Sequence, residues 1–431
     1  MKIRHLLTVI AIVLIFELPT SAQIKQLNEL VYTKQYTLLE RALATTHIST
    51  NDKILYKAFL TNAFNQPEAS NLLLKKIFAG KIAAGDSKLQ FYLHRIAYDN
   101  YVKLNNYKAA HMASEQLVKY YSAWFSASEL TDQQEENKIW AALATAPAQQ
   151  AHKQASSVIP IKKDMAGLWN IPVQQQGSSY LFVFDTGANI STISASYAQK
   201  LHLDVVKNSQ VSIEGGMNGV STKVNLGIAT QLNMGNVQIN NALFLIFPDS
   251  ALSFAGGAYK INGIIGLPII KALEEITIGK DAMQIPLIVD RKTIPHNLAL
   301  DLLQPVIYME YQGKSLPFTF DTGAQVTLFS DNFYKQFKPH LDSIAKKDSL
   351  HMGGAGGSRR MKTLKVPQLI FTVDHKQVLF NNTQVNVEET QVSDKYYYGN
   401  MGQDMFAQFT SMTINFVNSS VSFGNRKKQA K

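Results

Sequence analysis

The chain has 431 residues, of which 46% are apolar and 17% are charged, so it can bury at least two ordinary hydrophobic cores. It contains no cysteine, which excludes disulfides, lipid-modified cysteines, thiol catalysis and thiolate metal sites. The net charge is +10, but the basic residues are scattered in short clusters without interleaved aromatic residues, so we expect no nucleic-acid partner.

Residues 1–22 have the pattern of a secretory signal peptide. Lys2 and Arg4 precede an uncharged apolar run at residues 6–16, and small residues lead to a predicted cleavage after Ala22. No apolar run reaches the roughly 20 residues that a transmembrane helix needs, so we expect no stable membrane span after cleavage. These features predict an exported protein, periplasmic or secreted, and the lack of disulfides favours a bacterial one.

Residues 23–143 are predicted to form an all-helical domain, because apolar residues recur there at spacings of three and four. The clearest faces are Leu38, Leu39, Ala42 and Leu43; Leu72, Leu73, Ile77 and Phe78; and Leu89, Leu93, Ile96, Ala97 and Tyr101. A turn at Asn105 and Asn106 between two such segments loosely resembles a tetratricopeptide helix pair. A plain helical bundle is an equal alternative.

Residues 144–160 are predicted to be an exposed linker and a domain boundary, because residues 145–157 carry no large apolar side chain. Beyond the linker the chain is predicted to be mainly β, in two homologous lobes at residues 161–292 and 293–431. The signals are short alternating or β-branched runs, punctuated by Gly and Asn, at residues 180–184, 237–239, 318–320 and 369–373.

The β region contains an internal repeat with an offset of 136 residues. The segment LFVFDTGANISTIS around Asp185 corresponds to PFTFDTGAQVTLFS around Asp321. Gly177 and Gly313 each lie eight residues before their Asp, where a hairpin turn would join two strands.

Further matches follow downstream in the same order. The glycine-rich segment EGGMNG at residues 214–219 corresponds to GGAGG at residues 353–357, and GIIGLPII at 263–270 corresponds to GNMGQDMF at 399–406. In both copies a short helical stretch and then a strand come next. A single Asp-Thr-Gly triplet is a weak signal, whereas two copies inside matching repeats point to a shared structural role.

These motifs resemble the aspartic peptidases, specifically their retropepsin-like branch, over about residues 165–425. In that family an apolar strand enters Asp-Thr-Gly, and a later Ile-Ile-Gly-type segment passes beside it in a psi-shaped loop. Ala188 and Ala324 follow the glycines as in retroviral peptidases, where pepsin-like enzymes carry Ser or Thr. The resemblance implies two lobes of the closed β-barrel type in one chain, which is compatible with a monomer.

The resemblance assigns the catalytic carboxylate pair to Asp185 and Asp321. The loops that support this pair are implied to contain Thr186, Gly187, Ala188, Thr322, Gly323 and Ala324. The psi-loop residues are Ile264, Ile265, Gly266, Asn400, Met401 and Gly402. The flap candidates, for which ordinary hairpin turns are the alternative, are Gly215, Gly216, Gly219, Gly353, Gly354, Gly356 and Gly357.

Two adjacent carboxyls can hydrolyse a peptide bond without a metal or other cofactor. One takes a proton from a water while the other donates a proton to the substrate. Because two close carboxylates cannot both ionise easily, the pair shares one proton, and which member is the base stays open. Ala188 and Ala324 offer no hydroxyl to the carboxylates, so we expect a less acidic pH optimum than in pepsin-like enzymes.

The expected substrate is a peptide or protein segment in extended conformation, held by main-chain hydrogen bonds between the flaps and the carboxyl pair. The alternative is a catalytically silent peptide- or protein-binding module on the same fold. Phosphoryl transfer would need a neighbouring Lys or second Asp in alternating strands and helices. Metal-dependent hydrolysis would need clustered histidines, whereas the ten histidines are dispersed and His351 is expected to be a loop residue.

The predicted helical domain has three interpretations: a prosegment that blocks the cleft, an adaptor for a substrate or protein partner, or a structural cap on the first lobe. Helical-repeat surfaces commonly bind proteins, which favours the adaptor. Self-processing within residues 145–157 is the alternative.

Overall fold

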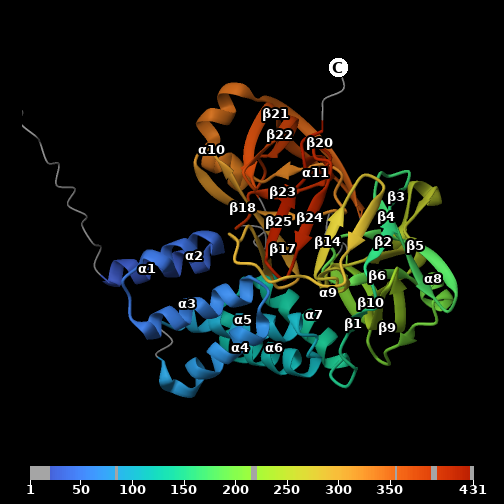
Figure 1. The fold of residues 1–431 in the computed structure, drawn as a ribbon, viewed down its shortest axis with the longest axis horizontal. Coiled ribbons are helices and arrows are strands. Elements are labelled where there is room, and N and C mark those ends of the chain that lie inside the picture. Colours follow the sequence, from blue (N-terminus) through green and yellow to red (C-terminus); the bar gives the residue numbers. More distant parts are fainter. Residues whose placement is uncertain (1–19, 83–85, 215–220, 355–356, 390–395, 428–431) are drawn as a thin grey trace, which may run out of the picture.

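The computed structural model describes residues 20–82, 86–214, 221–354, 357–389 and 396–427. Within them, long helices occupy the chain up to Ala142, and β-sheets with a few short helices follow from Gln150 onwards. Figure 1 shows the helices, blue to teal, gathered on one side of the sheets. The fold is therefore mixed, with helices first and sheets second. We call residues 20–142 the helical part, 150–285 the first β part and 298–423 the second β part.

Local sequence sets where several helices begin. The Ser126 hydroxyl accepts a hydrogen bond from the Glu129 N–H, and the Glu129 carboxylate accepts one from the Ser126 N–H, which makes a capping box. Asp86 caps another helix by accepting from the Leu89 N–H at 2.8 Å. The helices are α1 (Thr20–Tyr32), α2 (Tyr36–Thr45), α3 (Thr50–Ala63), α4 (Pro67–Lys76), α5 (Ser87–Lys103), α6 (Tyr107–Tyr121) and α7 (Ala127–Ala142), with short turns η1 (Ile77–Lys81) and η2 (Ser122–Trp124).

The expected apolar face holds on α5, where Leu89, Leu93 and Ile96 are buried. Along α4 and η1 it holds only in part, because Ile77 is buried but Leu72 is 66% exposed and Phe78 is 46% exposed. The buried side there consists of Ser70, Leu74 and Ile77. A run of three leucines fits more than one helical face, and tertiary packing decided between them.

The turn between α5 and α6 lies at the predicted asparagines. Asn105 has a φ of 54°, a left-handed conformation that asparagine tolerates, and the Asn106 side chain accepts from the Ala109 N–H at 3.2 Å. One such helix pair does not establish a repeat, so the tetratricopeptide likeness stays a prediction.

Residues 144–160, expected to be an exposed linker, contain two strands. β1 (Gln150–Lys153) pairs with β10 (Val237–Phe247), and β2 (Ser157–Pro160) pairs with β15 (Ala282–Ile285). The expectation failed because strand pairing uses backbone groups, which polar residues supply as well as apolar ones. The segment between the helical part and the first β part therefore belongs to the sheets through β1 and β2.

The main sheet of the first β part has the order β1-β10-β6-β13-β5-β4-β9-β7, in which β10 also pairs with β9, β3 pairs with β4 and β8 pairs with β9. Its other strands are β3 (Lys162–Lys163), β4 (Trp169–Gln175), β5 (Ser178–Phe184), β6 (Ser191–Ser194), β7 (Asp204–Val205), β8 (Val211–Glu214), β9 (Ser221–Met234) and β13 (Gly263–Ile265), with β11 (Ser253–Phe254) paired to β12 (Tyr259–Lys260). Its short helices are α8 (Ala195–Lys200), η3 (Asp249–Leu252), η4 (Ala255–Gly257) and α9 (Leu267–Ala272).

The second β part has the order β16-β17-β18-β23-β19-β22-β21-β20, and β17 also pairs with β21. Its strands are β16 (Leu298–Asp301), β17 (Gln304–Tyr311), β18 (Lys314–Phe320), β19 (Leu328–Phe329), β20 (Lys346–Gly354), β21 (Gly357–Val373), β22 (Lys376–Asn386) and β23 (Gly399–Met401). Two helices, α10 (Asp331–Ile344) and α11 (Gln403–Phe406), belong to it.

Both parts contain the predicted hairpin ahead of the Asp-Thr-Gly segment. Gln176 and Gly177 join β4 to β5 with φ values of 47° and 80°, and Gln312 and Gly313 join β17 to β18 with 47° and 75°. Two consecutive positive φ angles are the signature of the tight turn that matches the twist of a β-hairpin.

A third sheet joins the two β parts in the order β2-β15-β14-β24-β25. It contains β14 (Glu275–Ile278), β24 (Met412–Asn415) and β25 (Ser420–Phe423). Thr277 on β14 lies opposite Thr413 on β24, with their hydroxyl oxygens 2.8 Å apart, and these residues are 136 positions apart. Equivalent positions that face each other are the pattern of a two-fold axis.

The helical part shares its cores with the sheets. One apolar cluster runs from α5, α6 and α7 into both β parts, and another joins α1–α5 to Ala299, Val306, Tyr308 and Tyr397. Within the residues that the structure describes, no helix is long and apolar enough to cross a membrane.

Candidate active site

The two Asp-Thr-Gly segments form equivalent loops at the ends of β5 and β18. The Asp185 N–H donates to the Ile265 carbonyl at 3.0 Å, and the Asp321 N–H donates to the Met401 carbonyl at 3.0 Å. The short strands that supply these carbonyls, β13 and β23, run parallel to β5 and β18 in matching registers. Each aspartate is thereby fixed by a strand that returns from about 80 residues later.

Thr186 and Thr322 bind the two loops to each other. Each threonine hydroxyl accepts a hydrogen bond from the other threonine's N–H at 3.0 Å. Each also donates to the opposite β-strand, Thr186 to the Phe320 carbonyl and Thr322 to the Phe184 carbonyl, both at 2.9 Å. Both side chains are completely buried. This closed network sets the spacing of the two loops.

Gly187 and Gly323 allow the two carboxyls to face each other across the loops. A Cβ atom on Gly187 would lie 2.6 Å from Cγ of Asp321, and one on Gly323 would lie 2.5 Å from Cγ of Asp185. Any side chain would therefore displace the opposite carboxyl.

The two carboxyls receive similar backbone donors. The Gly187 N–H donates to Oδ1 of Asp185, and the Gly323 N–H donates to Oδ1 of Asp321, both at 2.8 Å. Burial raises the pKa of Asp185 well above its ordinary value, and the charge of Asp321 and a hydrogen bond to it raise that pKa further. These causes favour one proton held between the two side chains.

The psi-loop candidates pair with the strands that lead into the two aspartates. Ile264 and Ile265 pair with β5, while Asn400 and Met401 pair with β18. The two glycines that follow are held by hydroxyls: the Gly266 N–H donates to Ser191 at 3.0 Å, and the Gly402 N–H donates to Thr327 at 3.1 Å.

The second loop has side-chain contacts that sequence reasoning missed. Asn400 Nδ2 donates to Oδ2 of Asp321 at 2.9 Å, and the Thr319 hydroxyl donates to the Asn400 amide oxygen at 2.6 Å. Asp404 accepts from both the N–H and the hydroxyl of Thr327. Gln403 donates to the Thr322 carbonyl. The sequence did contain a signal for these contacts: the second copy has polar residues, such as Asn400 and Gln403, where the first copy has the apolar Ile264 and Leu267.

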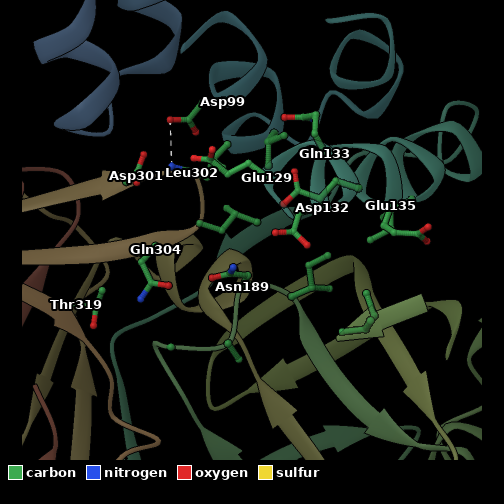
Figure 2. Close-up of a pocket in the computed structure, with 18 of the residues that line it drawn as sticks. Asp99, Glu129, Asp132, Gln133, Glu135, Asn189, Asp301, Leu302, Gln304 and Thr319 are labelled. Atoms are coloured by element: carbon green, nitrogen blue, oxygen red, sulfur yellow. Dashed lines mark hydrogen bonds between the residues drawn. The ribbon is translucent and has the colours of Figure 1, made fainter. Parts of the chain in front are cut away.

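The carboxyl pair lies in the wall of a cavity of about 1220 Å³ between the helical part and both β parts. Figure 2 shows Glu129, Asp132, Gln133 and Glu135 of α7 on one side of it, with Asn189 and Gln304 across from them. We call the charged side chains that the helical part contributes the charged helical wall: Lys34, Arg95, Asp99, Glu129, Asp132, Glu135 and Glu136. The cavity is large enough for several residues of a peptide.

Four of the seven flap candidates, Gly215, Gly216, Gly219 and Gly356, lie outside the described residues. Gly353 and Gly354 end β20, and Gly357 begins β21 opposite Gly354. From the paired strands β8 and β9, the first hairpin, Ser212, Ile213, Ser221 and Thr222 line the same cavity as the carboxyl pair.

α7 also contacts the first hairpin, because the Ser212 N–H donates to the Glu135 carboxylate at 3.4 Å. In the part of the chain that the structure describes, no group of three or more His, Asp or Glu side chains is arranged to hold a metal ion. His351 is an exposed residue of β20.

A family model described as "Aspartyl protease" matches residues 171–269. This segment contains Asp185 and the psi loop through Ile269, so it supports an aspartic peptidase domain in this part of the chain. No curated protein sequence matches the chain. An aspartic peptidase domain suggests peptidase activity, and Asp321 lies outside the matched segment.

Proposed function

We propose that the protein is an aspartic endopeptidase in which Asp185 and Asp321, one from each of two homologous lobes, activate a water for peptide hydrolysis. The observation that carries this proposal is the pair of equivalent loops, cross-bonded by Thr186 and Thr322, that bring the two carboxyls face to face. The additional pairings of β10 with β9 and of β17 with β21 support a closed barrel in each lobe.

In the proposed reaction the pair holds one proton. The ionised carboxylate takes a proton from the water as the water oxygen bonds to the scissile carbonyl carbon, and the protonated carboxyl gives its proton to the carbonyl oxygen. The tetrahedral diol then collapses: the C–N bond breaks, the leaving nitrogen takes the proton from the first carboxyl, and one diol hydroxyl returns a proton to the second. The pair ends as it began.

The Thr186–Thr322 network supports this chemistry by keeping both loops in place without reorganisation. The substrate proposed for the cavity is a peptide or protein segment in extended conformation. Main-chain hydrogen bonds to the hairpin that carries Ser212 and Ser221 would hold it there. This form of recognition requires no cofactor.

We further propose that the helical part remains with the enzyme, where its charged wall contacts the substrate or a protein partner. The strands β1 and β2 lie within the sheets, and α7 lines the cavity. Both features support a permanent wall over a removable prosegment. Export to the periplasm or the cell exterior, after cleavage behind Ala22, belongs to the same proposal and rests on the pattern of the N-terminal sequence.

The test is hydrolysis of a mixed peptide library by the full chain and by the form that begins at Gln23, from acidic to neutral pH. Asp185→Asn and Asp321→Asn should each abolish cleavage, with a loss of about 10³-fold or more, because each removes one of the two proton-transfer groups. Asp281→Asn changes an exposed carboxyl outside the cavity and should leave the rate unchanged.

The same data separate the alternatives. The pH optimum should be less acidic than in pepsin-like enzymes, since Ala188 and Ala324 bring no hydroxyl to the carboxyls. A folded wild-type protein that binds peptides in pull-down but cleaves none would favour the silent binding module. Cleavage that survives either aspartate substitution would contradict the paired mechanism.

A further inference from the structure

Asn400 makes the two halves of the carboxyl pair unequal. Its Nδ2 donates to Oδ2 of Asp321 at 2.9 Å. An amide N–H can only donate, and a carboxylate oxygen can only accept, so this bond favours the ionised form of Asp321.

Thr319 fixes the direction of the Asn400 amide. The Thr319 hydroxyl donates to the amide oxygen at 2.6 Å, which leaves the amide nitrogen facing the carboxyl. Thr319 and Asn400 lie opposite each other in the parallel pairing of β18 with β23. The orientation of the donor is therefore built into the sheet, and Figure 2 shows Thr319 on the side of the cavity formed by the second β part.

The first copy lacks this device. At the positions 136 residues earlier stand Val183 and Ile264, which pair in the same register and are 3% and 8% exposed. Neither side chain can donate a hydrogen bond. The backbone donors of the two loops correspond: the Gly187 and Gly323 N–H groups each lie 2.8 Å from their own carboxyl. The Ala324 N–H also donates to Oδ1 of Asp321 at 3.1 Å, and the Ala188 N–H at the equivalent position likewise favours the ionised form of Asp185.

Other titratable groups also face this cavity. The charged helical wall, Asp301, Tyr396 and Tyr397 line the cavity that contains both carboxyls. The charge that raises the pKa of Asp185 is that of Asp321 itself. The Asn400 amide is thus a side-chain donor to Asp321, whereas Ile264 at the equivalent position has none to offer Asp185.

We infer that Asn400, oriented by Thr319, is a positioning residue that holds Asp321 as the ionised member of the pair and leaves the shared proton on Asp185. In the reaction, which rests on the proposed function, Asp321 is then the base that takes the proton from water. Asp185 is the acid that protonates the carbonyl oxygen.

The order of ionisation can be tested without peptidase activity, so its outcome is independent of the proposed function. Asp185→Asn leaves Asp321 alone in the site, and Asp321→Asn leaves Asp185 alone. Difference infrared titration of the carboxyl C=O stretch, against the protein with both substitutions, reports each lone carboxyl. Asp321 should ionise about one to two pH units below Asp185.

Adding Asn400→Ile to the Asp185→Asn protein copies the first-copy side chain and should remove most of that difference. Thr319→Val copies Val183 and should shift the titration in the same direction by a smaller amount, which provides a second variant if Asn400→Ile folds poorly. The inference would be overturned if the two lone carboxyls ionised at the same pH, or if Asp185 ionised at the lower pH. It would also be overturned if neither Asn400→Ile nor Thr319→Val changed the pH at which Asp321 ionises.

In the protein with both aspartates, Asn400→Ile should move the acidic limb of the kcat/KM profile to higher pH by about one unit. A residue with a merely structural role would lower the rate at every pH alike. Inactivity of the wild-type protein would count against the proposed function. The order in which the two carboxyls ionise, measured by infrared titration, would still decide the role of Asn400.

Discussion

Thr186 and Thr322 illustrate why the residue after each aspartate carries a hydroxyl. Each hydroxyl donates to a backbone carbonyl and accepts from a backbone N–H of the opposite loop, with both groups buried. A hydroxyl is the smallest side chain that does both. Alanine would leave two buried backbone groups without partners, each at a cost of about 1–3 kcal/mol.

Asp185→Asn should stabilise the protein increasingly as the pH rises. Because burial and the charge of Asp321 raise the pKa of Asp185, folded Asp185 keeps its proton at pH values where the unfolded chain, with a pKa of about 3.9, has lost it. For a raised pKa, stability is fully present below the unfolded value and is lost as the pH rises through the folded value.

Asparagine carries no such proton, so its gain over the wild type should be smallest below about pH 4 and should grow by up to about 1.4 kcal/mol per pH unit above it. Urea unfolding across pH measures this gain. Asp281→Asn, at an exposed position outside the cavity, is the control. A difference for Asp185→Asn that does not vary with pH would contradict the raised pKa.

At the scale of elements, short strands hold the site. β13 and β23 are three residues long, yet each lies between two neighbours and fixes an Asp-Thr-Gly loop through one carbonyl. Their equivalent registers agree with the repeat, because Ile265 and Met401 are 136 residues apart, as Asp185 and Asp321 are. The sheet containing β14 and β24 then joins the two copies.

The β14–β24 pairing predicts an energetic coupling between Thr277 and Thr413. Thr277→Val or Thr413→Val alone leaves a half-buried hydroxyl without its partner and should cost about 1 kcal/mol, whereas both together should cost little more than either. A double-mutant cycle in urea measures the coupling. Thr277→Val combined with Thr230→Val, in a different sheet, serves as the additive control. Additive costs for the Thr277–Thr413 pair would contradict the pairing.

At the scale of the whole molecule, the helical part is bound to the second β part by specific polar contacts. Lys34 forms an ion pair with Asp301, and the Tyr308 hydroxyl donates to the Lys34 carbonyl at 2.6 Å. Buried Lys103 donates to the Leu300 carbonyl at 2.9 Å and pairs with Asp99. Figure 1 shows the helices against both β parts, and the charged helical wall lines the same cavity as the carboxyl pair.

Cutting the chain between the helices and the sheets should therefore not separate them. A specific protease site placed at the exposed residues Gln154 and Ala155 leaves β1 on the helical fragment and β2 on the other. We expect both fragments to elute together at equal amounts in size-exclusion chromatography and to part only in denaturant. Lys34→Ala, which removes the ion pair with Asp301, should weaken the association. Fragments that separate in native buffer would support a removable prosegment.

The sequence alone predicted what local pattern and repetition encode. The Gly177 and Gly313 turns and the helices before residue 143 follow from turn residues, from the 136-residue offset and from apolar periodicity, whereas the position of Ile265 and Met401 beside the aspartates was implied by the family resemblance. Such signals lie within a few residues or compare two copies of one pattern, so no knowledge of distant contacts is needed.

Only the tertiary structure decided what depends on partners far along the chain. The polar residues 150–153 form a strand because their backbone groups pair with those of β10. Leu72 is exposed because another face of α4, which includes Leu74, packs against the rest of the protein. Asn400 acquired a role only where β23 set its amide against Asp321. Hydrogen-bond partners and burial are properties of the assembled fold, and the identity of a residue does not fix them.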